Sequence, residues 1–352
     1  MKTWDAIVIG GGVIGLSIAL EFSKRGTKVL VVERSETGRE ASHAAGGMLA
    51  HCDPHTPEVV RPLATASAEL YSEFVHELQD ETRVHIDLRQ QGTVAFLKPG
   101  EIPVNGRKLS SDELAALEPH LVAPGVAHFL PEACVDPRGL VEALARSLHH
   151  RAVDIVTGSA VVAVETTDRR VTGVRTERTL YPAPVAINCA GAWSIGIPPV
   201  PLRTHPVKGQ MLSIVPAPGS PHFSLNHVVR SGGCYLIPRT DGKVVIGATV
   251  EDAGFDKRVD PDVIRNLHEQ ATNLLPELGE GRILEAWAGL RPGSPDGLPM
   301  IGETSYGGYL AATGHYRDGI LLAPITARII TQLVAGESPE VNLLPFAPER
   351  FR

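Results

Sequence analysis

The chain has 352 residues, a formal net charge of −7 at neutral pH and 43% hydrophobic residues. This length exceeds that of a typical single domain, and the composition is that of a globular protein with a sizeable core. A negatively charged chain without a basic patch is not expected to bind nucleic acid. We therefore predict a two-domain globular protein with no nucleic-acid partner.

The cysteines and the apolar runs further restrict the class of protein and its cellular location. The four cysteines lie far apart and form no CxxC pair, so we expect neither a metal site nor a disulfide framework. The apolar stretch 6–20 has an acid before it and a glycine triplet inside it, and it is too short to span a bilayer. These features predict a protein of the reducing cytoplasm with no membrane contact.

A dinucleotide-binding βαβ unit is predicted at the start of the chain. Residues 6–9 form an apolar strand, and a second strand over 28–32 ends at Glu33. The glycines of the G-x-G-x-x-G fingerprint between them are Gly10, Gly12 and Gly15. We expect the first to make the tight turn, the second to admit a pyrophosphate and the third to let the following helix pack closely on the strand. The helix N-terminus would face the phosphates, and Glu33 would accept the ribose hydroxyls, which disfavours a 2′-phosphate.

Further along the chain, helical and strand patterns follow one another in blocks. A loop is expected over 35–47 and a strand pair within 84–97. Helices are expected over 62–79, 112–118, 138–150 and 261–275. Strands are expected over 154–165, 171–175, 185–188, 207–215, 227–238 and 244–250, the last two joined as a hairpin by the turn 240–242. A strand–loop–helix unit over 309–335 follows, with Pro324 in the first helical turn. This order indicates a nucleotide domain in discontinuous pieces, with β-rich blocks inserted between them.

Seven motifs occur in a recognisable order along the chain. They are the N-terminal fingerprint, Ala44-Ala45-Gly46-Gly47-Met48, Pro206-Val207-Lys208-Gly209, Cys234-Tyr235-Leu236-Ile237-Pro238-Arg239, Gly247-Ala248-Thr249, Trp287-Ala288-Gly289-Leu290-Arg291-Pro292-Gly293 and Gly314-His315-Tyr316-Arg317-Asp318-Gly319-Ile320-Leu321. With them the chain resembles, over nearly its whole length, the D-amino-acid oxidase family of flavoproteins, and within it the glycine oxidases.

The resemblance implies an α/β fold (α+β overall), with a Rossmann-like FAD-binding domain and an inserted antiparallel-sheet substrate domain. We expect the FAD-binding domain to comprise residues 1–82, 136–200 and 286–352. The substrate-binding domain would then comprise 83–135 and 201–285.

The cofactor that the resemblance implies is FAD, held noncovalently. By the match, Val13 and Ile14 line the pyrophosphate turn, and Glu33 and Arg34 hold the adenosine ribose. Val161 matches a residue whose backbone contacts the adenine. The residues beside the flavin would be Ala41, Ser42, Gly46, Gly47 and Met48, although a methionine equally often fills a core. The loop closing over the isoalloxazine ring would comprise His315, Tyr316, Arg317, Asp318, Gly319, Ile320 and Leu321.

Three side chains match substrate-binding positions. Arg291 is the candidate for the substrate carboxylate, since a guanidinium offers two parallel N–H bonds and its neighbours are small and rigid; the alternative is a surface arginine in a loop. Tyr235 matches a tyrosine that bonds the same carboxylate or shields the site, against the alternative of an ordinary core or rim aromatic. Arg317 matches a second arginine that aids substrate entry or holds its loop, and a loop salt bridge is the alternative.

Two positions depart from the glycine oxidase pattern. Gly233 stands where those enzymes carry a histidine, and Val250 where they carry a methionine. Both changes remove volume near the pocket and put the preference for glycine itself in question. No cysteine follows Cys234, so a flavin thioether near the C-terminus has no candidate. His43 precedes an Ala-Ala-Gly run, the position through which related amine dehydrogenases attach flavin, and covalent attachment there remains the alternative.

The activity that the resemblance implies is oxidative deamination of glycine or another small amino acid such as D-alanine or sarcosine. O2 would be the acceptor, and the products would be a 2-oxo acid, ammonia or a primary amine, and hydrogen peroxide, with the imine serving thiamine thiazole synthesis. A homo-oligomer, a tetramer, is implied as well. The alternatives are an N-methyl amino acid oxidase or D-amino acid dehydrogenase on the same scaffold, and a flavin-binding subunit without a substrate of its own.

Overall fold

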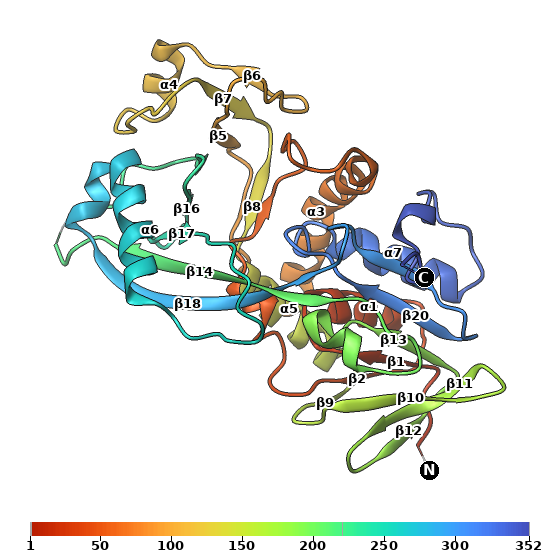
Figure 1. The fold of residues 1–352 in the computed structure, drawn as a ribbon. Coiled ribbons are helices and arrows are strands. Elements are labelled where there is room, and N and C mark those ends of the chain that lie inside the picture. Colours follow the sequence, from red (N-terminus) through yellow and green to blue (C-terminus); the bar gives the residue numbers. More distant parts are fainter. Residues whose placement is uncertain (1, 220, 352) are drawn as a thin grey trace.

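The architecture is seen in a computed structural model that describes residues 2–219 and 221–351 (Figure 1). Its first main sheet has six strands in the order β19-β20-β13-β1-β2-β9. Their bounds are β1 (Ala6–Ile9), β2 (Val29–Val32), β9 (Asp154–Val156), β13 (Val185–Asn188), β19 (Met300–Glu303) and β20 (Tyr309–Thr313). Neighbouring strands pair in parallel except β19 and β20, which are antiparallel. The βαβ unit predicted at the start of the chain is therefore present, with α1 (Val13–Lys24) between β1 and β2.

Both faces of this sheet are covered, which explains why β1 and β2 are wholly apolar. Ala6 and Val8 pack with the helices on one face, whereas Ile7 and Ile9 pack against a three-stranded sheet on the other. The helices are α1, α3 (Arg61–Thr82), α5 (Pro137–His150) and α7 (Ala323–Val334). The covering sheet consists of β10 (Val161–Thr167), β11 (Arg170–Thr176) and β12 (Leu180–Pro182).

The second main sheet has eight strands in the order β18-β14-β17-β16-β15-β5-β7-β6. Their bounds are β5 (Thr93–Phe96), β6 (Arg107–Lys108), β7 (Ala127–Leu130), β14 (His205–Val215), β15 (Val228–Arg230), β16 (Tyr235–Pro238), β17 (Val244–Gly247) and β18 (Arg282–Gly293). All pairs are antiparallel except β15 with β5. A short sheet of β3 (Met48–Leu49), β8 (Ala133–Val135) and β4 (Leu88–Arg89) lies beside it.

The two faces of the second sheet have different neighbours. Leu212 and Leu236 point to a core that also holds apolar residues of α4 (Ser111–Leu117) and α6 (Pro261–Leu274). The alternate residues Met211 and Ile237 belong to a smaller cluster that includes Met48. Because side chains alternate along a strand, Met211 and Ile237 point to the opposite face of the sheet, toward Met48.

The sequence predictions of individual elements are largely confirmed, with four corrections. The predicted loop 35–47 contains a one-turn helix, α2 (Ala41–Ala44). The strands predicted within 84–97 do not pair with each other, because β4 pairs with β8 whereas β5 pairs with β15 and β7. The stretches 154–165 and 227–238 each divide into two strands, β9 and β10 in the first and β15 and β16 in the second. The strands not predicted are β3, β6, β7, β8, β12, β18 and β19. All of these except β18 have only two to four residues, and glycines and a proline interrupt the alternation of β18.

The division of the chain into an FAD-binding and a substrate-binding domain remains a proposal. β18 continues through residue 286, the predicted start of the last FAD-binding segment, and pairs with β14 from end to end. Among residues 2–219 and 221–351, no helix has both the length and the apolar character needed to cross a membrane.

The close packing of α1 on β1 gives a testable prediction. A Cβ atom at Gly15 would lie 2.0 Å from the Gly10 carbonyl oxygen, so Gly15→Ala forces the helix away from the turn. We expect a loss of stability of about 1–3 kcal/mol, together with a lower FAD content, measured by thermal unfolding and flavin absorbance. Gly125→Ala is the control, because a Cβ at Gly125 meets no atom within 4 Å. Equal stability and FAD content in the two variants would contradict the packing argument.

Candidate active site

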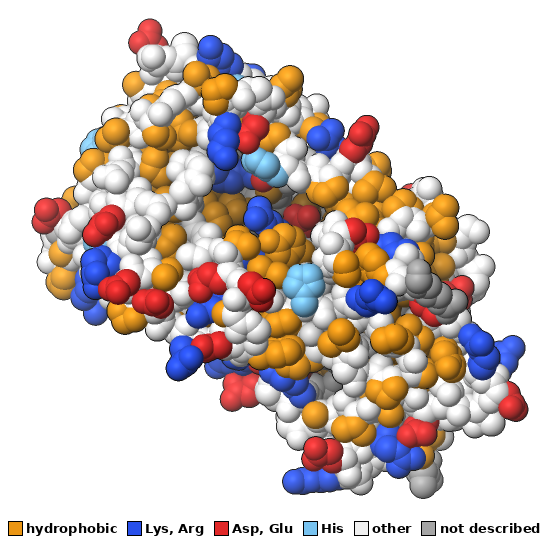
Figure 2. All heavy atoms as spheres, in the orientation of Figure 1, with side chains coloured by type: hydrophobic (Ala, Val, Ile, Leu, Met, Phe, Trp, Pro, Cys, Tyr) orange, Lys and Arg blue, Asp and Glu red, His pale blue; other side chains and the backbone are white. Residues whose placement is uncertain are grey.

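A cavity of about 920 Å³ lies between the glycine turn of the first sheet and the inner face of the second. Its walls come from segments far apart in the sequence: the turn after β1, the end of β2, the region around α2, the strands β14 and β16–β18, and the loop between β20 and α7. Figure 2 shows one face of the molecule hollowed near its centre, with hydrophobic and charged side chains around the hollow.

The glycine turn has the geometry of an anion site. Gly10 has a φ of +106°, and a Cβ there would lie 2.5 Å from the Cys189 carbonyl oxygen. Gly12 is the N-cap of α1 and has no side chain to cap it, and the first helical turn carries no acid. The Val13 N–H donates to Ser42 Oγ at 2.9 Å. A helix N-terminus that begins at a glycine and carries no acid suits the pyrophosphate of a dinucleotide.

Glu33 is held in place by the backbone around it. Its Oε2 accepts the Gly11 N–H at 2.7 Å and its Oε1 accepts the Ser35 N–H at 2.9 Å. The residue is buried, lines the cavity, and keeps lone pairs free for further donors. A fixed carboxylate at the end of β2 therefore fits the ribose role predicted for it.

Most of the predicted cofactor-binding residues line this one cavity. Those that do are Gly10, Gly12, Val13, Ile14, Glu33, Arg34, Ala41, Ser42, Gly46, Gly47, Met48, Val161, His315, Tyr316, Arg317, Asp318, Gly319 and Ile320. Gly15 and Leu321 do not line it: Gly15 lies under the turn, against the Gly10 carbonyl, and Leu321 belongs to the hydrophobic core. His43 does not line the cavity either, and burial together with Arg138 lowers the pKa of its ring.

The backbone of Gly46–Gly47 lies so close to other segments of the same chain that side chains at these two positions would not fit. A Cβ at Gly47, whose φ is +82°, would lie 1.9 Å from the Val135 carbonyl oxygen, and one at Gly46 would lie 2.8 Å from Ile237 Cδ1. The buried Arg239 donates to the Gly46 carbonyl at 2.7 Å. The sequence singled out Arg239 only as part of a motif. In the structure its hydrogen bond to the Gly46 carbonyl stabilises the cavity wall.

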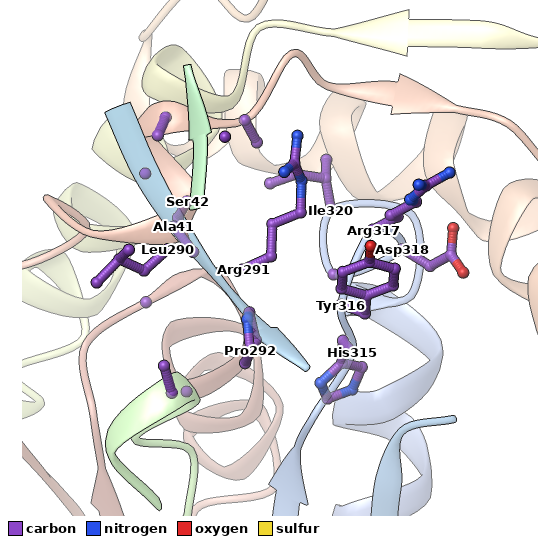
Figure 3. A pocket seen from close by; sticks show the side chains of 18 of the residues that line it. Ala41, Ser42, Leu290, Arg291, Pro292, His315, Tyr316, Arg317, Asp318 and Ile320 are labelled. Atoms are coloured by element: carbon purple, nitrogen blue, oxygen red, sulfur yellow. The ribbon is translucent and has the colours of Figure 1, made fainter. Parts of the chain in front are cut away.

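Arg291 projects from β18 into the cavity without a carboxylate partner. Its Nη1 donates to the Thr249 carbonyl at 3.0 Å, and in residues 2–219 and 221–351 it forms no ion pair. Arg291 pairs with Val207 of β14, and its guanidinium lies over Gly209, two residues further along that strand. A Cβ at Gly209 would lie 2.4 Å from Nη1, so glycine leaves the space that the guanidinium occupies. Figure 3 shows Arg291 between its strand and the loop that carries Arg317. The arrangement presents a positive charge, fixed by backbone, to an anionic ligand.

Tyr235 lies next to this guanidinium on the cavity wall. Burial raises the pKa of its phenol, and the charge of Arg291 opposes the rise. A Cβ at Gly247, the residue paired with it on β17, would lie 2.7 Å from the hydroxyl oxygen. The phenol is therefore a neutral hydrogen-bond donor beside Arg291.

The loop between β20 and α7 supplies the facing wall. Burial lowers the pKa of His315 to about 3, so its ring is neutral, and its Nε2 lies 3.1 Å from Thr326 Oγ1. The Arg317 guanidinium lies over the Tyr316 ring, 5.3 Å from its centroid. Burial raises the pKa of Asp318 to about 6, with a further contribution from the charge of Asp53.

Sequence reasoning missed an ion-pair cluster at the rim. Arg230 Nη1 lies 2.6 Å from Asp53 Oδ2, and its Nη2 lies 3.0 Å from the buried Glu132. Both Arg230 and Asp53 line the cavity. The partners are 98 and 177 residues from Arg230 in sequence, so no local pattern could have joined them.

The two positions that depart from the glycine oxidase pattern lie at the open part of the cavity. Gly233 and Val250 both line it, and Val250 is 53% exposed. A Cβ at Gly233 would lie 2.3 Å from Gln270 Oε1, the end of a flexible side chain. The small residues therefore leave this rim open.

Known proteins share both the sequence and the fold. Residues 5–333 match the family model described as FAD dependent oxidoreductase. The glycine oxidase of Pseudomonas putida is 33% identical over 98% of each chain. The bifunctional protein ThiO/ThiG of Synechocystis is 34% identical over 99% of this chain, which spans 54% of that protein. The crystal structure of glycine oxidase from Geobacillus kaustophilus superposes with a TM-score of 0.94 at 29% identity and covers 100% of both chains.

The comparisons agree with the predicted resemblance and with the predicted α/β fold. The chain spans about half the length of the bifunctional relatives that it matches. A family match over most of the chain, together with a cavity suited to a dinucleotide, identifies the cofactor as FAD. The chain belongs to the FAD-dependent oxidoreductases of the D-amino-acid oxidase family.

Proposed function

We propose that this protein catalyses the oxidative deamination of small amino acids, among them glycine, sarcosine and D-alanine. The observation that carries the proposal is the Arg291 guanidinium, which faces the FAD cavity beside the Tyr235 phenol, donates to backbone carbonyls and has no carboxylate partner in the described residues. The glycine oxidases among the relatives support the choice of substrate. The reaction converts an amino acid, O2 and water into a 2-oxo acid, ammonia or a primary amine, and hydrogen peroxide.

Arg291 and Tyr235 position the substrate in this proposal. The guanidinium binds the carboxylate, and the neutral phenol adds a hydrogen bond, so the α-carbon is held in one orientation. When bound, FAD would supply the two-electron acceptor for this oxidation, with O2 as the final oxidant. The substrate reacts as the free amine, and no side chain has to remove a proton from carbon.

We further propose that FAD is held noncovalently and that the imine product serves thiamine thiazole synthesis. The position of His43 outside the cavity lining supports noncovalent binding of FAD. The ThiO/ThiG relative supports a role in thiamine thiazole synthesis. A cytoplasmic location and a homo-oligomer, a tetramer by resemblance, remain part of this proposal.

An electron-transferring subunit without a substrate is the main alternative from another class. Such a subunit would need no clamp for a carboxylate, whereas the adjacent Arg291 and Tyr235 on the cavity wall have the groups that such a clamp requires. An N-methyl amino acid oxidase or a D-amino acid dehydrogenase would use the same clamp, and a panel of substrates and acceptors separates those activities.

Replacing Arg291 by lysine tests the clamp. Lysine keeps the charge but loses the planar fork that fixes a carboxylate through two bonds. We expect Arg291→Lys to retain FAD and to lose about 100-fold or more in kcat/KM, a change of roughly 3 kcal/mol in transition-state stabilisation. Arg282→Lys, at an exposed position on the same strand, is the control. Near wild-type kcat/KM in Arg291→Lys would show that another group binds the carboxylate.

The pH dependence tests the absence of a general base. Burial raises the pKa of Asp318 only to about 6, so its carboxyl is already ionised above neutral pH and adds no inflection there. The free amine of the substrate should then set the profile, and kcat/KM should rise about tenfold per pH unit while most of the amine is protonated. Steady-state kinetics between about pH 7 and 9.5 measure this rise in the wild type and in Asp318→Asn. A flat wild-type profile would contradict the mechanism.

The open rim predicts the substrate range. A methyl group that fills apolar space gains roughly 1 kcal/mol or less, so D-alanine or sarcosine should be at least as good a substrate as glycine. Val250→Met should shift the ratio of kcat/KM values about two- to fivefold toward glycine. Val259→Met, outside the cavity lining, is the control. A wild-type preference for glycine of more than about tenfold would mean that other residues fill the space.

A further inference from the structure

The segment 252–258, here called the strap, leaves the second sheet and returns to it. Before it, Glu251 and Lys208 exchange two backbone hydrogen bonds of 2.9 and 3.0 Å. After it, the Asp260 N–H donates to Gln210 Oε1 at 2.7 Å. Both ends of the strap are therefore fastened to β14, one strand away from Arg291.

A buried lysine holds the base of the strap. Lys208, only 5% exposed, donates from Nζ to the Arg258 carbonyl at 2.7 Å and lies 3.7 Å from a Glu251 carboxylate oxygen. Within the strap, Arg258 forms an ion pair with Asp256 at 2.6 Å. These contacts fix the path of the strap.

The tip of the strap contacts residues of the nucleotide-binding segments. The Phe255 ring lies 5.2 Å from the Trp193 ring, centroid to centroid, at an interplanar angle of 31°. The Arg34 guanidinium lies 3.5 Å from the centroid of the same tryptophan. Trp193 thus contacts both the strap and the residue that follows the ribose-binding Glu33.

An ion-pair chain runs parallel to these ring contacts. One carboxylate oxygen of Glu40 lies 3.0 Å from Lys257 Nζ, and the other lies 2.6 Å from Arg34 Nη2. Glu40 therefore joins the strap to Arg34 by a second route. Isolated surface pairs contribute little, but a carboxylate shared by two cations that also make packing contacts restrains more than a single pair does.

The residues that receive the strap line the cavity, whereas the strap tip does not. Arg34, Glu40 and Trp193 line the cavity together with Glu33. Phe255 and Lys257 contact Trp193 and Glu40 but do not line the cavity themselves. Phe255 is 50% exposed, so its position against Trp193 is not a consequence of core packing. The tip therefore supports the nucleotide end of the FAD cavity from outside.

We propose that the strap retains FAD by holding Arg34, Glu40 and Trp193 against the nucleotide half of the cofactor, with Phe255 and Lys257 as positioning residues. Release of FAD requires these three wall residues to move outward, and the strap opposes that movement. Substrate binding at Arg291 uses other groups, so loss of the strap contacts raises the FAD dissociation rate and leaves turnover at saturating FAD unchanged.

The experiment follows FAD release from the holoenzyme by the recovery of flavin fluorescence after dilution. Phe255→Ala and Lys257→Gln should each raise the dissociation rate about two- to tenfold, and the double variant should raise it further. Lys257→Arg should release FAD at the wild-type rate, because arginine keeps the ion pair with Glu40. High salt should speed release from the wild type more than from Lys257→Gln, since screening removes the same pair.

Two matched substitutions control for general destabilisation. Leu284→Ala removes a 51% exposed apolar side chain from β18, and Lys243→Gln removes a 3.0 Å ion pair with Asp241 in a hairpin turn. Both should release FAD at the wild-type rate. Strap variants that release FAD within twofold of wild type would overturn the proposal. So would an accelerated release matched by an equal loss of thermal stability in the apoprotein, which would indicate a structural role only.

Discussion

The site depends on a guanidinium that is held by backbone rather than by an acid. Arg291 lies across β14, where Gly209 leaves space for it, and carbonyl oxygens accept its hydrogen bonds. A carboxylate side chain in the same place would neutralise the charge and compete with any anionic ligand. Because carbonyls orient the guanidinium without cancelling its charge, the cavity keeps an attraction for anions that water only partly screens.

The two sheets meet around glycines, and this contact makes a single cavity from distant segments. Gly46 allows the chain near α2 to lie against Tyr235 and Ile237 of the second sheet, and Gly289 lies where a Cβ would be 2.3 Å from Ala44 Cβ. The part of the cavity at the glycine turn and the part beside Arg291 are thus in direct contact. The strap adds a second connection between the same parts, from the strands beside Arg291 to the nucleotide end.

Local patterns predicted much of this arrangement from the sequence. The alternation and glycine spacing around Gly10 and Gly15 predicted the βαβ unit, because a short chain segment determines that geometry. The motif order predicted the family and singled out Arg291 and Tyr235, which line one cavity. Contacts between distant residues could not be predicted in this way. The Arg230 pairs, the buried environment of Asp318 and the contact of Phe255 with Trp193 all depend on how complete elements pack.

Anaerobic mixing of the holoenzyme with amines, followed by flavin absorbance, tests the central claim most directly. Glycine, sarcosine and D-alanine should each bleach the flavin, because their carboxylates can bind the Arg291 guanidinium. Methylamine and ethylamine, which lack a carboxylate, should leave the absorbance unchanged over the same time. An oxidised spectrum with every amino acid, or equal bleaching by the simple amines, would contradict a carboxylate clamp beside the flavin.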